Sequence, residues 1–332
     1  MSVITVCEYL WNMLTSYEQS KHAPERVLAQ ADPFSGRALL ALLRVIGLLP
    51  LSLRSVLGAC IGYLFGLIPS RDRRFAALQL RAFLPAHNAT ALLPRIFANT
   101  GRTMLESLNL KPLLRTGYPN IKCADWERVT TWLAEDRPLV TLTAHTGNWD
   151  LLAAYGISRG VALTTIGREA RSPTGQVVLR ALREAYGIET VWRSDRSGLK
   201  RLLACLKERR VIAALLDQDT RVDSISVPFF GTPAQTPSAL IGLGQKFNAR
   251  FVSAFIFRTS CFGFEIFIEE LDSSSSAEQL LSEYNRRLET LIRRFPSQWV
   301  WFHKRWRTQP SGLKLSSREY AEWLATLPVT LL

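Results

Sequence analysis

Residues 138–150 read PLVTLTAHTGNWD, a short apolar run that ends at a histidine. Residues 139–144 of this segment combine β-branched and apolar side chains directly after a proline, which is typical of a buried strand. Three similar runs follow, with amphipathic segments between them, at residues 161–166, 188–192 and 211–216. Strands that alternate with helices predict a largely parallel sheet flanked by helices.

The segments around these strands agree with that architecture. One helix is expected to start at Ser172, a capping residue followed by proline at the first helical position, and another after Asp195. Residues 251–258 and 262–269 predict a later pair of strands, and residues 277–295 predict a long surface helix. We therefore expect an α/β fold.

The N-terminal third has a different character. Residues 38–68 are mostly apolar, but Arg44, Pro50 and Arg54 interrupt them, and the longest uncharged piece, 55–68, has 14 residues. A spanning helix needs about 20. Helices that lie in the headgroup region, with both arginines among phosphates, are favoured over a span or ordinary core helices. We expect a helical membrane-associating region over residues 1–110 and an α/β core over 111–332, together one compact unit.

Composition excludes several classes of protein. The 332 residues are 47% hydrophobic and 21% charged, too apolar for a disordered chain, and the formal net charge is +13. This charge predicts anionic partners: nucleic acid, phospholipid, a lipopolysaccharide precursor or an acidic carrier protein. The five cysteines have no metal-ligand spacing and are expected to be reduced thiols in a cytosolic compartment. Residues 1–20 lack a basic leader, so no secretory signal peptide is expected.

Common catalytic motifs are absent from the sequence: GxSxG, GxxxxGK[ST], GxGxxG and HExxH do not occur. Asp217, Asp219 and Asp223 superficially resemble a cation-binding loop. Arg221 occupies a ligand position and the required glycine is missing, so no metal site is expected.

His145 and Asp150 are the most informative polar pair. On an unbroken helix, side chains five residues apart lie about 140° apart, so these two meet only if His145 lies in a loop. Gly147 supplies a bend and Asn148 can cap a helix, which places Asp150 in the first turn facing the imidazole. In such a dyad the acid fixes the tautomer and the histidine accepts a proton from a nucleophile. A histidine hydrogen-bonded at a strand end is the structural alternative.

The HxxxxD segment at residues 145–150 resembles that of the late lipid A acyltransferases, the lauroyl/myristoyl group within the lysophospholipid acyltransferase superfamily. Other blocks resemble that family in its order: GRTMLE at 101–106, GRE at 167–169, REAYG at 183–187, LDQD at 216–219, VPFFGTPAQT at 227–236 and PSQWVWFHKR at 296–305. The resemblance spans residues 40–307. Glutamate is more usual where Asp150 stands, which leaves the exact acceptor open.

The resemblance implies transfer of a fatty acyl chain from a thioester, usually on acyl carrier protein, to a hydroxyl of a glucosamine-based lipid A precursor. In this interpretation His145 is the general base and Asp150 orients it. Arg168 and Arg183 match family arginines and suit lipid phosphates or a developing oxyanion, with plain surface charge as the alternative.

Asp217 and Gln218 complete the expected substrate-binding residues. Asp217 resembles the family's acid after the fourth strand, where it can order an arginine or the acceptor, or form a structural salt bridge. The expected partners are acyl carrier protein, a phosphorylated lipid and a membrane surface, with coenzyme A as an alternative acyl carrier and with no cofactor. The expected location is the cytoplasmic face of the cell inner membrane, as a peripheral or monotopic protein.

Two alternatives remain open. A lysophospholipid, an amino-acid lipid or another glycolipid can replace the lipid A precursor on the same fold. The aromatic and basic residues at 299–307 suit nucleic-acid stacking, a membrane interface or a half-buried strand. Nucleic acid is disfavoured because residues 38–68 have no use in such a protein. The turn at 229–231 predicts either a lining for an acyl-chain channel or core packing.

Overall fold

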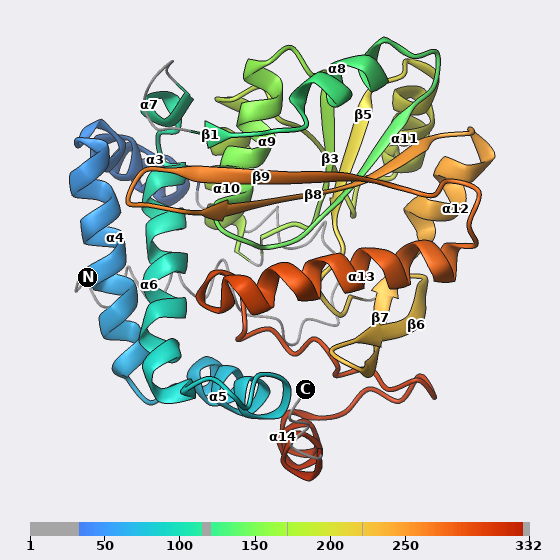
Figure 1. Cartoon of the computed structure of the whole chain (residues 1–332). Coiled ribbons are helices and arrows are strands. Elements are labelled where there is room, and N and C mark those ends of the chain that lie inside the picture. The colour runs from blue at the N-terminus through green and yellow to red at the C-terminus, as the bar shows by residue number, and fades with distance from the viewer. Residues whose placement is uncertain (1–32, 115–120, 171, 221, 328–332) are drawn as a thin grey trace.

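Parallel strands form the centre of the computed structural model, which describes residues 33–114, 121–170, 172–220 and 222–327 (Figure 1). Five of the seven strands in the main sheet run parallel, and β9 is antiparallel to β8. The strand order is β1 (Ile121–Lys122), β9 (Phe264–Leu271), β8 (Arg250–Arg258), β2 (Leu139–Thr143), β5 (Val211–Leu215), β3 (Leu163–Gly167) and β4 (Glu189–Trp192). The predicted α/β class and each predicted strand of this sheet are confirmed.

Alternate side chains of the strands face two apolar layers. Val140 and Leu142 of β2 belong to the layer with α13 (Ala277–Arg294), whereas Leu139 belongs to the layer with α8 (Trp126–Ala134) and α9 (Trp149–Ser158). The first layer also includes α11 (Gly198–Lys207) and α12 (Ala239–Lys246). Strands covered on both faces explain the nearly continuous apolar runs in the sequence.

The remaining described elements surround this core. Ser172 caps α10 (Pro173–Glu184) by accepting a hydrogen bond from the Gly175 N–H, as predicted. The short elements are α7 (Lys111–Leu114), the hairpin of β6 (Ser224–Phe229) and β7 (Thr232–Pro237), the 3-10 helix η1 (Pro296–Gln298) and α14 (Ser317–Thr326).

The N-terminal part consists of α3 (Pro33–Leu48), α4 (Leu51–Leu67), α5 (Arg71–Phe83) and α6 (Ala89–Ser107). Helices α4 and α6 lie side by side at one end of the sheet (Figure 1). Glycines allow this approach: a Cβ on Gly62 would lie 2.1 Å from the Phe97 carbonyl oxygen, and a Cβ on Gly58 would lie 2.4 Å from that of Gly101. The two backbones are therefore packed as closely as glycine permits.

Arg54 corrects one expectation from the sequence. Its side chain is fully buried and donates hydrogen bonds to the carbonyl oxygens of Leu49, Leu105, Glu106 and Asn109, at 2.9–3.0 Å. Those of Leu105, Glu106 and Asn109 lie at the C-terminal end of α6, where helix carbonyls lack intrahelical partners. Arg54 is thus a buried helix cap rather than a ligand of membrane phosphates.

The outer face of α3 and α4 is apolar. The exposed large side chains there are Leu42, Val45, Leu48, Leu53, Val56, Leu57, Tyr63, Leu64, Leu67 and Ile68. Among the described residues, no single helix is both long and apolar enough to cross a bilayer. Arg37–Leu48 and Leu51–Leu67 meet that test only as a pair, and they are bent by 118°.

The aromatic residues near the C-terminus pack inside the protein. Trp299, Trp301 and Trp306 are at most 1% exposed, and Trp306 stacks on Phe229 with ring centroids 5.5 Å apart. Phe230 is also buried. This segment is therefore neither a membrane anchor nor a base-stacking surface, and residues 229–230 belong to the core.

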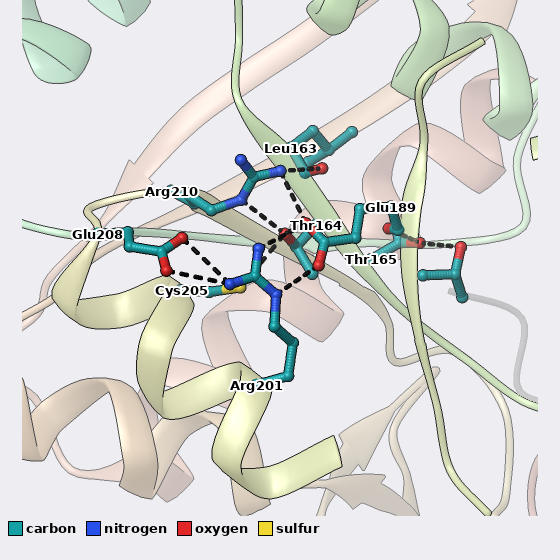
Figure 2. Close-up of polar contacts among 9 residues, drawn as sticks. Leu163, Thr164, Thr165, Glu189, Arg201, Cys205, Glu208 and Arg210 are labelled. Carbon is teal, nitrogen blue, oxygen red and sulfur yellow. Dashed lines mark hydrogen bonds and ion pairs between the residues drawn. The ribbon is translucent and has the colours of Figure 1, made fainter. Parts of the chain in front are cut away.

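A polar network fastens the amino end of the sheet, remote from the strand ends discussed below. Figure 2 shows Glu189 at the start of β4 paired with Arg201 of α11 and with Arg210, which lies just before β5. Arg201 also pairs with Glu208, and Arg210 donates a hydrogen bond to the Thr164 hydroxyl at 3.0 Å. The hydrogen bond from Arg201 is the main cause that lowers the pKa of Glu189. These contacts hold α11 on the sheet.

The contact between α4 and α6 makes a testable prediction. Gly62→Ala adds a methyl group that would clash with the carbonyl oxygen of Phe97. We therefore expect the free energy of unfolding to fall by roughly 1–3 kcal/mol. The control is Gly242→Ala in α12, where an added Cβ meets nothing within 4 Å. There the higher helix propensity of alanine should raise the free energy of unfolding by about 0.5–1 kcal/mol. Urea titrations of both variants measure this. Equal effects of the two substitutions would contradict the close packing.

Candidate functional site

The carboxyl ends of four parallel strands bring polar side chains to one edge of the sheet. His145 follows β2, Arg168 follows β3, Arg193 follows β4 and Asp217 follows β5. In open α/β sheets this edge is where ligands bind. His145, Arg168, Arg193 and the neighbouring Gln218 all line one cavity of about 440 Å³.

A tight turn holds His145. Gly147 has φ +51°, and a Cβ there would lie 2.4 Å from the carbonyl oxygen of Ile256 in β8, so glycine is required twice over. The Gly147 N–H donates to the Gln298 carbonyl at 2.9 Å, and the Thr103 hydroxyl donates to the Gly147 carbonyl at 2.6 Å. The turn is therefore clamped by β8, η1 and α6.

Asn148 continues the turn into α9, as the sequence predicts. Its side-chain oxygen accepts the Leu151 N–H at 3.0 Å, and its amide donates to the carboxylate of Glu106 at 3.2 Å. Glu106 is fully buried and forms an ion pair with the buried Arg258 at 2.5 Å. Because a buried charge is costly unless it is paired, this pair fixes Asn148, and with it the start of α9.

Asp217 is the acid that contacts the histidine. Its Oδ1 lies 2.8 Å from His145 Nδ1, and its Oδ2 accepts the His145 backbone N–H at 3.0 Å. The indole N–H of Trp299 donates to the same Oδ2 at 2.9 Å. The assignment of the orienting role to Asp150 is corrected here. The pairing of β2 with β5 brings Asp217 to the ring, whereas Asp150 lies in the first turn of α9.

These contacts decide the tautomer of the histidine. An ionised carboxylate only accepts hydrogen bonds, so the Nδ1 proton of His145 is directed at Asp217 and Nε2 carries the lone pair. The imidazole is 23% exposed and packs edge-on against the ring of Trp149. The Gln218 amide lies 3.3 Å from Nδ1. This arrangement leaves Nε2 as a base for a substrate proton.

Electrostatics favour the charged form of Asp217. Burial alone would raise its pKa, but the charge of His145 and the hydrogen bonds from His145 and Trp299 outweigh burial and lower it to about 2. The side chain of Asp217 is therefore ionised at neutral pH.

The cavity is apolar along most of its wall. Ile61 and Phe65 of α4 and Met104 of α6 line one side, and Val178 and Leu182 of α10 line another. An elongated apolar group fits such a wall, while most of the charged side chains lie at or beside the strand ends.

Asp150, predicted as catalytic, lies in the first turn of α9 and lines the same cavity, half-buried. Within the described ranges it forms no hydrogen bond or ion pair. Arg183 also lines the cavity and reaches over the end of β3, with Nη1 3.3 Å from the Thr190 hydroxyl. A Cβ on Gly167 would lie 3.2 Å from that Nη1, so the glycine makes room for the guanidinium.

Two residues of the site escaped the sequence analysis. Arg193 could have been found as the residue that directly follows the third predicted strand, residues 188–192. Trp299 had no local signal, because it meets Asp217 only through tertiary contact. Among the described residues, no group of three or more histidine, cysteine, aspartate or glutamate side chains could hold a metal ion.

The matching family model and the curated relatives are both described as acyltransferases. The sequence model of the family described as bacterial lipid A biosynthesis acyltransferase matches residues 34–308. Phosphatidylinositol mannoside acyltransferases from two strains of Mycobacterium tuberculosis are 22% identical over 177 residues, which is 52% of this chain and 56% of each relative. The match thus spans little more than half the length of these relatives.

Among solved structures, the chain is similar to the 1-acyl-sn-glycerophosphate (LPA) acyltransferase PlsC from Thermotoga maritima. The two have a TM-score of 0.33 and 14% sequence identity, over 75% of this chain and 99% of that one.

The lowered pKa of Asp217 predicts acid sensitivity. A carboxyl group whose pKa falls on folding stabilises the protein above its unfolded pKa, near 4, and loses that contribution as the pH falls through its folded pKa, about 2. Asp217→Asn should therefore lower the free energy of unfolding by about 2 kcal/mol at neutral pH and flatten its decline between about pH 4 and 2. Denaturant titrations across this range measure the change. The control is Asp136→Asn, an exposed partner of Arg209. Parallel curves for wild type and Asp217→Asn would argue against the contact.

Proposed function

Because the chain belongs to the bacterial lipid A biosynthesis acyltransferase family, we propose that it transfers a fatty acyl chain from an acyl carrier protein thioester to a hydroxyl of a phosphorylated lipid A precursor. The resemblance found in the sequence is confirmed at the level of the family, and the chain is an acyltransferase. The donor, the acceptor and the mechanism are the proposal.

One observation carries the mechanism: the ring of His145 is held by Asp217 through Nδ1 at the polar edge of an apolar cavity. Nε2 removes the proton of the acceptor hydroxyl as its oxygen attacks the thioester carbonyl carbon. Asp217 stabilises the imidazolium. When the tetrahedral intermediate collapses, the carbon–sulfur bond breaks and the imidazolium returns the proton to the thiolate. The products are an ester and a free thiol, and no enzyme nucleophile is required.

The cavity supports both substrates. Its apolar walls suit a fatty acyl chain. Arg168, Arg183 and Arg193 suit phosphate groups, because one guanidinium group can donate two parallel hydrogen bonds to two oxygens of a phosphate. The formal charge of +13 favours an acidic carrier protein as donor, by electrostatic steering. Coenzyme A remains the alternative carrier.

A second acceptor class has specific support. The mycobacterial relatives are named for a phosphatidylinositol mannoside, which is a glycolipid unlike lipid A. The same site would serve a lysophospholipid or an amino-acid lipid with a different headgroup. A comparison of these acceptors in one assay separates the two classes.

We also infer that the exposed face of α3 and α4 rests in a membrane interface, as expected of a peripheral or monotopic protein at the cytoplasmic face of the inner membrane. The supporting observation is the series of exposed apolar side chains on these two helices. Arg71 and Arg74 follow directly in α5 on the exposed surface, where they can meet anionic headgroups, whereas Arg73 is half-buried and donates a hydrogen bond to the Gly66 carbonyl at 2.8 Å.

The proposed base is tested with His145→Ala. We expect the rate of acyl transfer to fall about 10²–10⁴-fold, because the variant lacks the group that removes the hydroxyl proton. The assay supplies acyl carrier protein thioesters of several chain lengths and a tetra-acylated lipid A precursor, and mass spectrometry detects the gain of one acyl chain. His87→Ala, outside the cavity, is the matched control. Full activity of a folded His145→Ala protein would remove the mechanism.

The membrane face is tested by flotation with anionic vesicles. Val56→Glu and Leu64→Glu on α4 should each weaken binding about tenfold or more, because a buried apolar side chain contributes about 1.5–3 kcal/mol. Leu199→Glu and Leu313→Glu, which replace exposed leucines elsewhere, serve as controls. Equal binding by all four variants would place the interface on another face.

A further inference from the structure

Asp150 lines the cavity but is not the acid that contacts the ring of His145. It lies in the first turn of α9, where the positive end of the helix favours a carboxylate. It also lies where the main cavity meets a smaller one of about 110 Å³ between the sheet and helices α8 and α9, and it lines both. Its position is thus on the path of the substrates.

The contacts of His145 leave no role for a second carboxylate on the ring. Asp217 accepts both the Nδ1 proton and the backbone N–H of His145. The other ring nitrogen, Nε2, has to face the acceptor hydroxyl, so a carboxylate placed there would block the base. Asp150 therefore acts on something other than the imidazole.

The surroundings of Asp150 point to a ligand with hydrogen-bond donors. Its carboxylate is half-buried and, in the described part of the chain, has no hydrogen-bond donor or cation bonded to it. Its charge helps to raise the pKa of the cavity residue Tyr186, for which burial is the larger cause, and the Tyr186 hydroxyl oxygen already accepts the Leu110 N–H at 2.6 Å. An ionised carboxylate accepts hydrogen bonds and donates none.

We propose that Asp150 is a substrate-positioning residue. It accepts hydrogen bonds from hydroxyl or amide N–H groups of the acceptor that lie next to the hydroxyl to be acylated. These hydrogen bonds select which hydroxyl faces His145. The inference rests on the proposed function and narrows its substrate class. A sugar headgroup offers several such donors. A lysophospholipid with one free hydroxyl and a choline headgroup, which has no N–H, offers none besides the hydroxyl that attacks.

The test separates positioning from proton transfer by using water as a second acceptor. A bound thioester is either transferred to lipid or hydrolysed, and His145 with Asp217 serves both reactions. Asp217→Asn should slow both by a similar factor. Asp150→Asn should lower the ratio of transfer to hydrolysis about 10- to 100-fold and raise the KM for the lipid, because one charged hydrogen bond to the acceptor is lost.

Three comparisons complete the experiment. Asp150→Glu keeps the charge and should recover part of the ratio. Asp72→Asn removes a first-turn acid of α5 outside the cavity and controls for effects on helix stability. Wild-type protein receives either the tetra-acylated lipid A precursor, whose headgroup is a glucosamine disaccharide, or the lysophospholipid with one free hydroxyl, and the precursor should be preferred.

Each result decides one issue. An unchanged ratio in Asp150→Asn, or equal losses of transfer and hydrolysis that match those of Asp217→Asn, overturns the positioning role while the proposed function stands. Wild-type protein that hydrolyses the thioester but acylates neither lipid overturns the proposed function, and the inference fails with it. Transfer to the single-hydroxyl lipid at the rate of the disaccharide overturns the narrowed substrate class.

Discussion

The buried carboxylate of Asp217 joins three parts of the chain that are far apart in sequence. It follows β5, it holds both the backbone and the ring of His145 after β2, and it accepts the indole N–H of Trp299 near the C-terminus. A buried carboxylate is stable only when its oxygens are hydrogen-bonded. The orientation of the histidine therefore depends on correct assembly of the sheet and on the seating of the C-terminal segment.

A second set of contacts ties the same turn to the N-terminal helices. Thr103 and Glu106 project from α6 to Gly147 and Asn148, and Glu106 is held by Arg258. The opposite side of α6 is packed against α4, which carries the exposed apolar face. The backbone contact between the two helices leaves little room for sliding. The helices that would meet a lipid surface are thus rigidly placed relative to the proposed base.

The site separates apolar from polar chemistry along one cavity. Side chains from α4, α6 and α10 form apolar walls, whereas the segments after the strands supply His145, Arg168, Arg193 and Asp217. Helices α9 and α10 add Asp150 and Arg183 beside them. Because these charged side chains gather at one edge of the sheet, the reacting groups of a lipid substrate are drawn to that edge. Asp217 contacts Nδ1 of His145, on the side of the ring away from the proposed acceptor, while Asp150 lines the cavity that a substrate would fill.

Local sequence was sufficient for the framework of this protein. The apolar runs predicted every strand of the main sheet except the two-residue β1, Ser172 predicted the start of a helix, and the ordered blocks identified the family. His145 was placed correctly after a strand, since strand ends and caps depend on neighbours a few residues away. The partners of buried polar groups could not be predicted from local sequence. Asp150 was assigned to the histidine on spacing, but the register of β2 against β5 brings Asp217 there. Arg54 was expected among phosphates but caps α6. The tryptophans near the C-terminus were left between two surface roles and a half-buried strand, whereas they are fully buried. Each of these contacts joins residues distant in the chain, and only tertiary packing decides which of several chemically suitable partners a buried group meets.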